Sequence, residues 1–176
     1  MNWKPRRGST PSSGPPGAGS KPAGPEPTPY QRALGLLVRR EHSRKELARK
    51  LVDRGIEREQ AEQALDVLER QQFQSDERFA SALARSRAGA GYGPQRIRAE
   101  LATHGLAREE IEAALEACER DWAEAARELA SRRFGGKDLG DPAKRRKAVD
   151  FLLRRGFSSR DAAAAVRAVP GEFDVD

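Results

Sequence analysis

Residues 42–68 read HSRKELARKLVDRGIEREQAEQALDVL, the pattern of two short helices joined by a turn. In the second half, apolar residues recur at the i, i+3, i+4, i+7 spacing of an amphipathic helix. They are Ala61, Ala64, Leu65 and Leu68. Ser43 with Glu46 three residues later has the form of a capping box, so the first helix is expected to begin there. Gly55 is expected to end that helix in a left-handed conformation.

The same pattern occurs twice more, as YGPQRIRAELATHGLAREEIEAALEAC at 92–118 and DPAKRRKAVDFLLRRGFSSRDAAAAVRAV at 141–169. Its glycines, Gly55, Gly105 and Gly156, lie 50 and 51 positions apart. A leucine precedes each glycine by four positions and an apolar residue follows it: Leu51 and Ile56, Leu101 and Leu106, Leu152 and Phe157. A fixed period indicates a repeat protein. We therefore predict an all-α fold of three tandem three-helix repeats, with nine helices and no strand.

The repeat pattern divides the chain into five predicted parts. A Pro/Gly/Ser-rich basic tail covers 1–29, and the repeats cover 30–73, 74–121 and 122–170. A short acidic end, 171–176, follows the third repeat. The tail has too few apolar residues to offset its ordering entropy, so we expect it to be disordered. A weak basic contact through its cations is the alternative.

Composition narrows the class of protein. Of the 176 residues, 37% are hydrophobic and 34% are charged, which suits small helical units with thin cores. No apolar run approaches the roughly 18 residues of a membrane helix, and no signal peptide is visible. The chain has one cysteine, so we expect no internal disulfide and a cytoplasmic location. A net charge of +6 permits a nucleic acid or an acidic protein as partner.

Basic residues gather in each repeat and form the candidate binding surface. The partner- or DNA-binding candidates are Arg39, Arg40, Arg44, Lys45, Arg49 and Lys50 in the first repeat, Arg85, Arg87, Arg96 and Arg98 in the second, and Lys144, Arg145, Arg146, Lys147, Arg154 and Arg155 in the third. The second group ranks below the other two. A run of charges is equally typical of a solvated helix face, and for the first repeat both readings stay open. The head groups of its second helix are expected to point to solvent.

The sequence offers no arrangement suited to catalysis. His42 is expected in a loop or cap, His104 as an exposed last-turn residue, and Cys118 as a small core residue. No second His, Cys or acid cluster lies at metal spacing from His42. The glycines of SRAGAGYG, at 86–93, lack the Gly-Lys-Ser/Thr of a phosphate loop and indicate a turn. We therefore expect no enzyme, no cofactor and no metal.

Several motifs, taken together and in order, resemble the bacterial RecX family. They are Arg40-Glu41-His42-Ser43-Arg44, Glu46-Leu47, Leu51 with Gly55, Asp76-Glu77-Arg78-Phe79-Ala80, Tyr92-Gly93-Pro94, Ile97 with Leu101, and Leu152 with Arg155-Gly156-Phe157. Each motif is weak singly, and the resemblance spans Tyr30 to Val169. It implies an elongated, curved array of three-helix repeats that modulates the recombinase RecA. Such proteins are expected to lie in the groove of the RecA–DNA filament and to restrain ATP hydrolysis, strand exchange and repressor self-cleavage.

The partner that the resemblance implies is the RecA nucleoprotein filament, with single- or double-stranded DNA as a further partner. We expect a monomer that does not associate with membranes. The residues alone also permit a second function, that of a stand-alone nucleic-acid-binding helical repeat protein. Such a protein would bind bare DNA without the recombinase, so the two functions differ in a measurable way.

Overall fold

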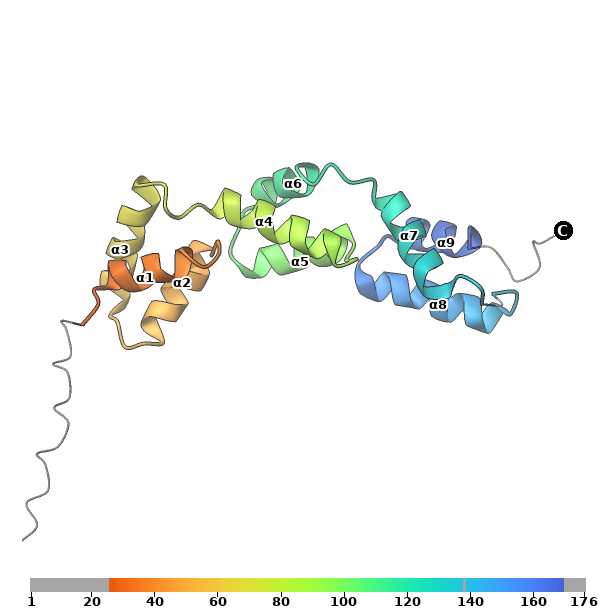
Figure 1. Cartoon of the computed structure of the whole chain (residues 1–176), viewed down its shortest axis with the longest axis horizontal. Coiled ribbons are helices and arrows are strands. Elements are labelled where there is room, and N and C mark those ends of the chain that lie inside the picture. Colours follow the sequence, from red (N-terminus) through yellow and green to blue (C-terminus); the bar gives the residue numbers. More distant parts are fainter. Residues whose placement is uncertain (1–25, 138, 170–176) are drawn as a thin grey trace, which may run out of the picture.

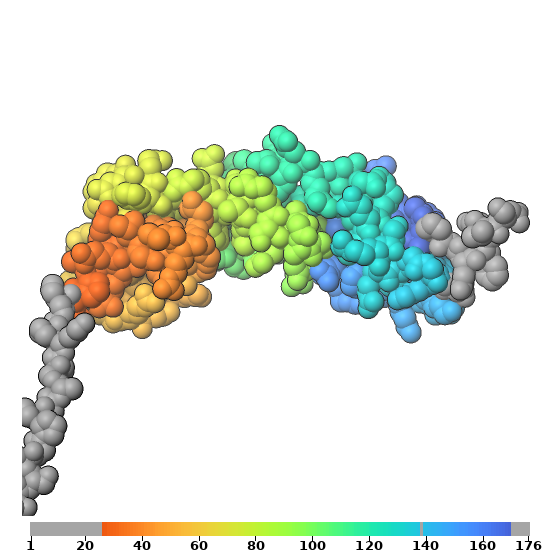
Figure 2. Space-filling view, viewed as in Figure 1, coloured from red at the N-terminus to blue at the C-terminus, as the bar shows by residue number. Residues whose placement is uncertain are grey.

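The computed structural model describes residues 26–137 and 139–169. These residues form nine α-helices and no strand, which confirms the predicted all-α class. The helices fall into three groups of three that lie one after another in an elongated, gently arched row (Figures 1 and 2). Residues 1–25 and 171–176 of the predicted tail and acidic end lie outside the described part.

We name the three groups unit 1, unit 2 and unit 3. Unit 1 comprises α1 (Pro29–Leu37), α2 (Arg44–Val52) and α3 (Arg58–Arg70). Unit 2 comprises α4 (Asp76–Gly89), α5 (Pro94–Thr103) and α6 (Arg108–Glu116). Unit 3 comprises α7 (Trp122–Phe134), α8 (Pro142–Arg155) and α9 (Ser159–Arg167). In each unit the first and third helices pack along one another, and the second helix packs mainly against the third.

The helices begin at the capping residues that the sequence indicates. Ser75, Asp141 and Ser158 each accept a hydrogen bond from a backbone N–H in the first turn of the helix that follows. Thr28 caps α1 in a full capping box with Gln31, within the stretch assigned to the tail. At Ser43 only half of the predicted capping box forms. Its Oγ accepts from the Glu46 N–H, but the Glu46 carboxylate binds basic side chains instead.

The three repeated glycines have the predicted left-handed backbone. Their φ angles are +81° at Gly55, +83° at Gly105 and +91° at Gly156. The residue after the glycine then folds back, as where the Phe157 N–H donates to the Leu152 carbonyl at 3.2 Å. This turn sends the third helix of each unit back across the second.

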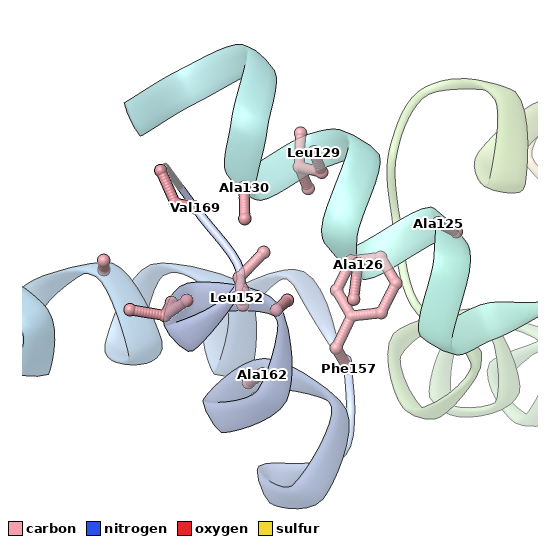
Figure 3. Packing of buried hydrophobic residues seen from close by; sticks show 11 residues of the cluster. Ala125, Ala126, Leu129, Ala130, Leu152, Phe157, Ala162 and Val169 are labelled. Carbon is pink, nitrogen blue, oxygen red and sulfur yellow. The ribbon is translucent and has the colours of Figure 1, made fainter. Parts of the chain in front are cut away.

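Each unit has its own apolar core. In unit 3, Phe157, Leu152 and Ala126 point into the space between α7, α8 and α9 (Figure 3). Alanines on α7 and α9, including Ala130 and Ala165, are buried and allow the two helices to approach closely. Burying a Leu or Phe side chain contributes about 1.5–3 kcal/mol, so these small cores rest on a few large residues.

Units 2 and 3 are joined by backbone hydrogen bonds and a shared aromatic ring. The Gly93 N–H donates to the Arg155 carbonyl at 2.8 Å, and the Gln95 N–H donates to the Gly156 carbonyl at 3.0 Å. The Trp122 ring is half-buried and packs against the cores of both units. The two units therefore share apolar surface as well as hydrogen bonds.

Candidate partner-binding surface

The predicted solvent-facing position of the α2 cations is wrong for Arg44. Its guanidinium lies 2.7 Å from Glu62 Oε2, 2.6 Å from Asp66 Oδ1 and 2.8 Å from Glu69 Oε2, all on α3. Burial opposes the charge, but hydrogen bonds to Asp66 and Glu62 raise the pKa of Arg44 above the ordinary arginine value. Arg44 therefore ties α2 to α3 rather than being free for a partner.

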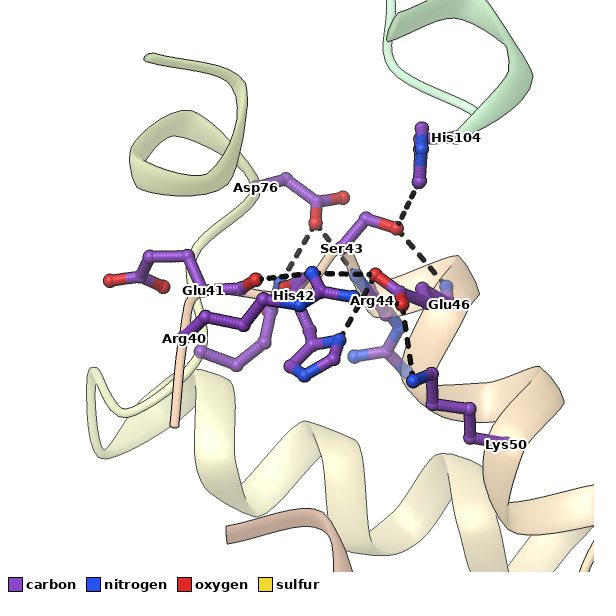
Figure 4. Close-up of polar contacts among 10 residues, drawn as sticks. Arg40, Glu41, His42, Ser43, Arg44, Glu46, Lys50, Asp76 and His104 are labelled. Atoms are coloured by element: carbon purple, nitrogen blue, oxygen red, sulfur yellow. Dashed lines mark hydrogen bonds and ion pairs between the residues drawn. The ribbon is translucent and has the colours of Figure 1, made fainter. Parts of the chain in front are cut away.

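Glu46 is the centre of a second network in unit 1 (Figure 4). Its carboxylate lies 2.6 Å from Arg40 Nη2, 3.0 Å from His42 Nδ1 and 3.3 Å from Lys50 Nζ. Burial raises the pKa of Glu46, but the hydrogen bonds from Arg40 and the close contact with His42 outweigh it and lower that pKa to about 2. Arg40 and Lys50 thus neutralise an internal carboxylate.

His42 lies in the loop before α2, as predicted, but only 3% of it is exposed. Burial lowers the pKa of His42 more than the neighbouring Glu46 carboxylate raises it, so the ring is neutral near pH 7. With a neutral ring, the contact to Glu46 is not an ion pair. The negative charge of Glu46 is therefore balanced by Arg40 and Lys50.

The joint between units 1 and 2 is polar. Ser43 Oγ lies 2.9 Å from His104 Nδ1, and Lys45 Nζ donates to the Thr103 carbonyl at 2.9 Å. The Arg44 N–H donates to Asp76 Oδ1 at 2.8 Å. His104 is therefore not the exposed residue that the sequence suggested, because unit 1 folds against the end of α5. Lys45 likewise binds within the chain.

A groove of about 720 Å³ lies beside this joint, between α2 and the α5–α6 turn. Four cations and four carboxylates line it. Five of these eight charged side chains, those of Arg44, Lys45, Glu46, Glu62 and Asp76, already have partners within the chain. The groove therefore favours neither an anionic nor a cationic ligand.

The second group of candidates is mostly engaged within unit 2. Arg87 forms a two-pronged pair with Glu100, at 2.8 and 2.6 Å. Arg98 does the same with Glu112, at 2.7 and 2.9 Å. Arg85 is exposed.

Arg96 and Arg155 both lie over the ring of Tyr92, with their Cζ atoms 4.8 and 5.0 Å from its centroid. Such cation–π contacts stabilise a half-buried tyrosine. Arg155 Nη1 also donates to the Ala90 carbonyl at 3.2 Å. These two arginines therefore help to hold the joint between units 2 and 3.

Helix α8 carries the densest run of exposed cations. Its first two turns present Lys144, Arg145, Arg146 and Lys147, all exposed. Arg145 donates to the Gly140 carbonyl at 3.3 Å. Ala148 and Leu152 face the core of unit 3, which directs Arg146 to the opposite side of the helix.

Six of the sixteen candidates are exposed, and their side chains form no hydrogen bond or ion pair with any described residue. They are Arg39, Arg49, Arg85, Arg146, Lys147 and Arg154. The ion pairs of Arg44, Arg87 and Arg98 could not be read from the sequence, because their partners lie on other helices. Further exposed cations near α8 were not among the predicted candidates, namely Arg132, Arg133, Lys137 and Arg167. The doublet Arg132-Arg133 at the end of α7 was the available signal.

The described residues contain no group of three or more acidic, histidine or cysteine side chains that could hold a metal ion. Cys118 is half-buried against the core of unit 2, and burial raises the pKa of its thiol. Within the described ranges, no helix has the length and apolar character needed to cross a membrane.

Family models match the chain in three consecutive segments. The first three-helix domain of RecX matches residues 30–68, the second matches 75–115, and the third matches 119–166. Each segment falls on one of the three units. The matches therefore cover most of the described chain in the order that the repeat pattern predicts.

Curated relatives are similar over nearly their whole length. The regulatory protein RecX of Xanthomonas oryzae pv. oryzae (strain MAFF 311018) is 57% identical over 82% of this chain and 91% of its own. The regulatory protein RecX of Xanthomonas citri is 60% identical over 81% of this chain and 88% of its own. That of Stenotrophomonas maltophilia (strain R551-3) is 54% identical over 84% of this chain and 90% of its own.

Solved structures have the same fold. A crystal structure of a regulatory protein RecX superposes with a TM-score of 0.63 at 27% identity, covering 78% of this chain and 70% of that one. The structure of RecX from Lactobacillus salivarius gives a TM-score of 0.65 at 22% identity, covering 80% of this chain and 94% of that one. With three matched domains in order and relatives above 50% identity, the chain belongs to the RecX family of regulatory proteins.

Proposed function

We propose that the protein regulates the recombinase RecA by binding the filament that RecA forms on DNA. Lying in the groove of that filament, it restrains ATP hydrolysis, strand exchange and the promotion of repressor self-cleavage. Membership of the RecX family supports the choice of partner, through the resemblance that the motifs carry. The elongated row of three units (Figure 2) supports an extended contact, in which each unit would meet a different part of the partner.

The observation that carries this proposal is the exposed cation run of α8. Arg146 and Lys147 form no ion pair within the described chain, so pairing them with a partner's anion breaks no internal contact. A RecA filament offers DNA phosphates and acidic side chains as such anions. Weak contacts from Arg39, Arg49 and Arg85 on the other units would add to this one through effective concentration.

The candidate cations that already have partners within the chain contribute to binding indirectly. Arg44 ties α2 to α3 within unit 1, Lys45 ties unit 1 to unit 2, and Arg155 supports the joint between units 2 and 3. We propose that these side chains keep the exposed cations in register along the row. Reversing the charge of Arg44 would then weaken binding by displacing α2 from α3 rather than by removing a contact with the partner.

The same exposed cations also support the second candidate, a stand-alone nucleic-acid-binding protein. Phosphate contacts alone would then supply the affinity, and it would fall steeply with salt. The two candidates differ in one respect. A filament regulator inhibits RecA at concentrations where bare DNA stays mostly unbound, whereas a simple DNA binder does not.

The test is the single-stranded-DNA-dependent ATPase activity of RecA, measured against concentration of the full chain. The double variant Arg146→Glu/Lys147→Glu is expected to need about 10-fold more protein for half inhibition, since 1.4 kcal/mol corresponds to tenfold. The matched control, Arg70→Glu/Arg108→Glu, makes the same charge change at exposed residues outside the candidate set. It should inhibit as the unchanged chain does.

Binding to a bare oligonucleotide is measured in parallel. Equal losses for Arg146→Glu/Lys147→Glu on filament and on bare DNA would favour the stand-alone binder. Inhibition unaffected by the folded double variant would remove α8 from the proposed surface. We further propose that the protein acts in the cytoplasm as a monomer, through binding alone, and light scattering of the purified chain tests the monomeric state.

A further inference from the structure

One end of unit 3 is strongly basic. Between residues 131 and 147 the sequence has seven cations and two acids, Asp138 and Asp141. The Asp141 carboxylate accepts the N–H of Ala143 as the cap of α8. The cations come from the end of α7, the loop that follows and the first turns of α8, with one more at the end of α9. This surface, named the basic end of unit 3, comprises Arg132, Arg133, Lys137, Lys144, Arg145, Arg146, Lys147 and Arg167.

The chain leaves unit 3 at this same end. The turn at Gly156 reverses the chain, so α9 runs back along α8 and ends near the first half of α8 (Figure 1). Val169, just beyond α9, is buried in one cluster with Ala130 of α7 and Ala148 of α8. Figure 3 shows Val169 beside Ala130. The residues that follow Val169 therefore start beside the basic end of unit 3.

The residues that follow Val169 are chemically complementary to this surface. They read PGEFDVD, with Glu172, Asp174 and Asp176 alternating with Phe173 and Val175. An extended chain covers roughly 3.3 Å per residue, so Asp174 can lie up to about 16 Å from Val169. Lys144 and Lys147 lie less than one helical turn apart, about 4.5 Å along α8. The three carboxylates thus have the reach to meet the cations of the first turns of α8.

We propose that the acidic segment 171–176 binds the basic end of unit 3 and competes there with an anionic partner. Carboxylates paired with Arg and Lys form charge-assisted hydrogen bonds. Because the segment is tethered a few residues away, its effective concentration is high even though each pair is weak. The segment occupies the cations until a ligand with denser charge, such as a row of phosphates, displaces it.

The competition rests on the proposed function, because it assumes that α8 belongs to the partner-binding surface. The contact itself does not, since it involves only this chain. The segment therefore sets a minimum charge density for a ligand of unit 3. Ligands with few anionic groups leave the segment bound, whereas a nucleic-acid backbone displaces it. The same contact makes binding by unit 3 weaker than its cations alone would allow.

The contact is tested by zero-length carbodiimide cross-linking of the full chain at low salt, followed by digestion and mass spectrometry. Links from Glu172, Asp174 or Asp176 to Lys147 or Lys144 are expected, and they should disappear at high salt. Lys50 and Glu46, whose atoms lie 3.3 Å apart, supply an internal positive control. A Lys50–Glu46 link without any link from the acidic segment to unit 3 would overturn the proposal.

The competition is tested with a labelled single-stranded oligonucleotide. The variant Glu172→Gln/Asp174→Asn/Asp176→Asn is expected to bind it about 3- to 10-fold more tightly at low salt, with the gain vanishing as salt screens the pairs. The control variant, Glu57→Gln/Glu77→Gln/Glu116→Gln, removes three exposed carboxylates from units 1 and 2. An equal gain in affinity for both variants would show an effect of net charge and would overturn the competition. So would the finding that neither variant binds the oligonucleotide.

The two proposals fail separately. If the cross-links form and the neutralised segment tightens oligonucleotide binding while RecA activity is unaffected, the inference stands and the filament function falls. If RecA is inhibited but neither the cross-links nor the affinity gain is found, the filament function stands and the inference falls.

Discussion

Gly93 and Gly156 meet backbone to backbone across the joint of units 2 and 3. A Cβ placed on Gly93 would lie 2.4 Å from the carbonyl oxygen of Gly156, and a Cβ on Gly156 would lie 2.4 Å from Cβ of Arg96. Real Cβ atoms do not approach other heavy atoms this closely. Glycine at both positions is therefore required for α5 to begin directly against the end of α8.

The first prediction concerns this contact. Gly93→Ala should lower the free energy of unfolding by about 1–3 kcal/mol, because the added methyl group forces the two units apart. The φ angle of Gly93 is −85°, which alanine adopts freely, so any loss comes from the contact alone. Urea denaturation measures it. Gly89→Ala is the control, since nothing lies within 4 Å of its Cβ position, and it should be neutral or stabilising.

The second prediction separates backbone strain from crowding. Gly55 has φ +81° and open space around its Cβ position, so Gly55→Ala meets no clash and only a strained backbone. The expected loss of stability is about 1–2 kcal/mol. Gly35 lies on α1 with equally open space and no positive φ, so Gly35→Ala should instead raise the free energy of unfolding by about 0.5–1 kcal/mol. Equal melting temperatures for the two variants would contradict the role of the left-handed turn.

The third prediction concerns pH. Glu46 has a folded-state pKa of about 2 against an ordinary 4.5, so its contribution is present above pH 4.5 and is lost as pH falls towards 2. His42 has a lowered pKa, so the unfolded chain takes up its proton first and stability begins to fall below pH 6.5. Both effects act in the same direction, and acid should destabilise the fold in two stages.

Glu46→Gln tests the acidic stage. At pH 7 it should cost about 2–3 kcal/mol, and between pH 4.5 and 2 its stability curve should be flatter than that of the unchanged chain. Urea denaturation at several pH values measures both. Glu116→Gln removes an exposed carboxylate and serves as the control, whose curve should follow that of the unchanged chain. Parallel curves for the Glu46→Gln variant and the unchanged chain would contradict the role assigned to Glu46.

The fourth prediction concerns Arg44. Arg44→Ala leaves three carboxylates of α3 close together without their cation and should cost about 1–2 kcal/mol. Arg44→Lys should recover only part, because one ammonium cannot serve three carboxylates in the way that a guanidinium does. Thermal melting measures the series. Arg49→Ala on the same helix, exposed and without an ion pair in the described chain, should change stability by less than about 0.5 kcal/mol.

The repeat architecture could be predicted from sequence because its signals are local. A capping residue, an apolar stripe and Gly55 or its equivalent each specify their own few residues, and the period joins them into a fold. The fate of Arg44 could not be predicted in this way. Its carboxylate partners lie 18, 22 and 25 positions away, and nothing marks them until α3 packs on α2.

The candidate surface likewise could be predicted only in part from the sequence. A run of arginines on α2 and one on α8 look alike in sequence, yet the first is largely used inside the chain. His104 shows it too, because an exposed position within unit 2 becomes a contact once Ser43 of unit 1 lies against it. Sequence could identify the cations, but only the arrangement of helices distinguishes those that are available.

Because of Trp122, the three units differ in how readily each can unfold separately from its neighbours. Its ring belongs to the cores of both unit 2 and unit 3, so unfolding either unit exposes hydrocarbon that the other needs buried. The described core of unit 1 contains no residue of its neighbour, and water can replace the hydrogen bonds that hold it. Units 2 and 3 should therefore exchange their slowest amide protons as one cooperative block, while unit 1 opens alone and at lower free energy.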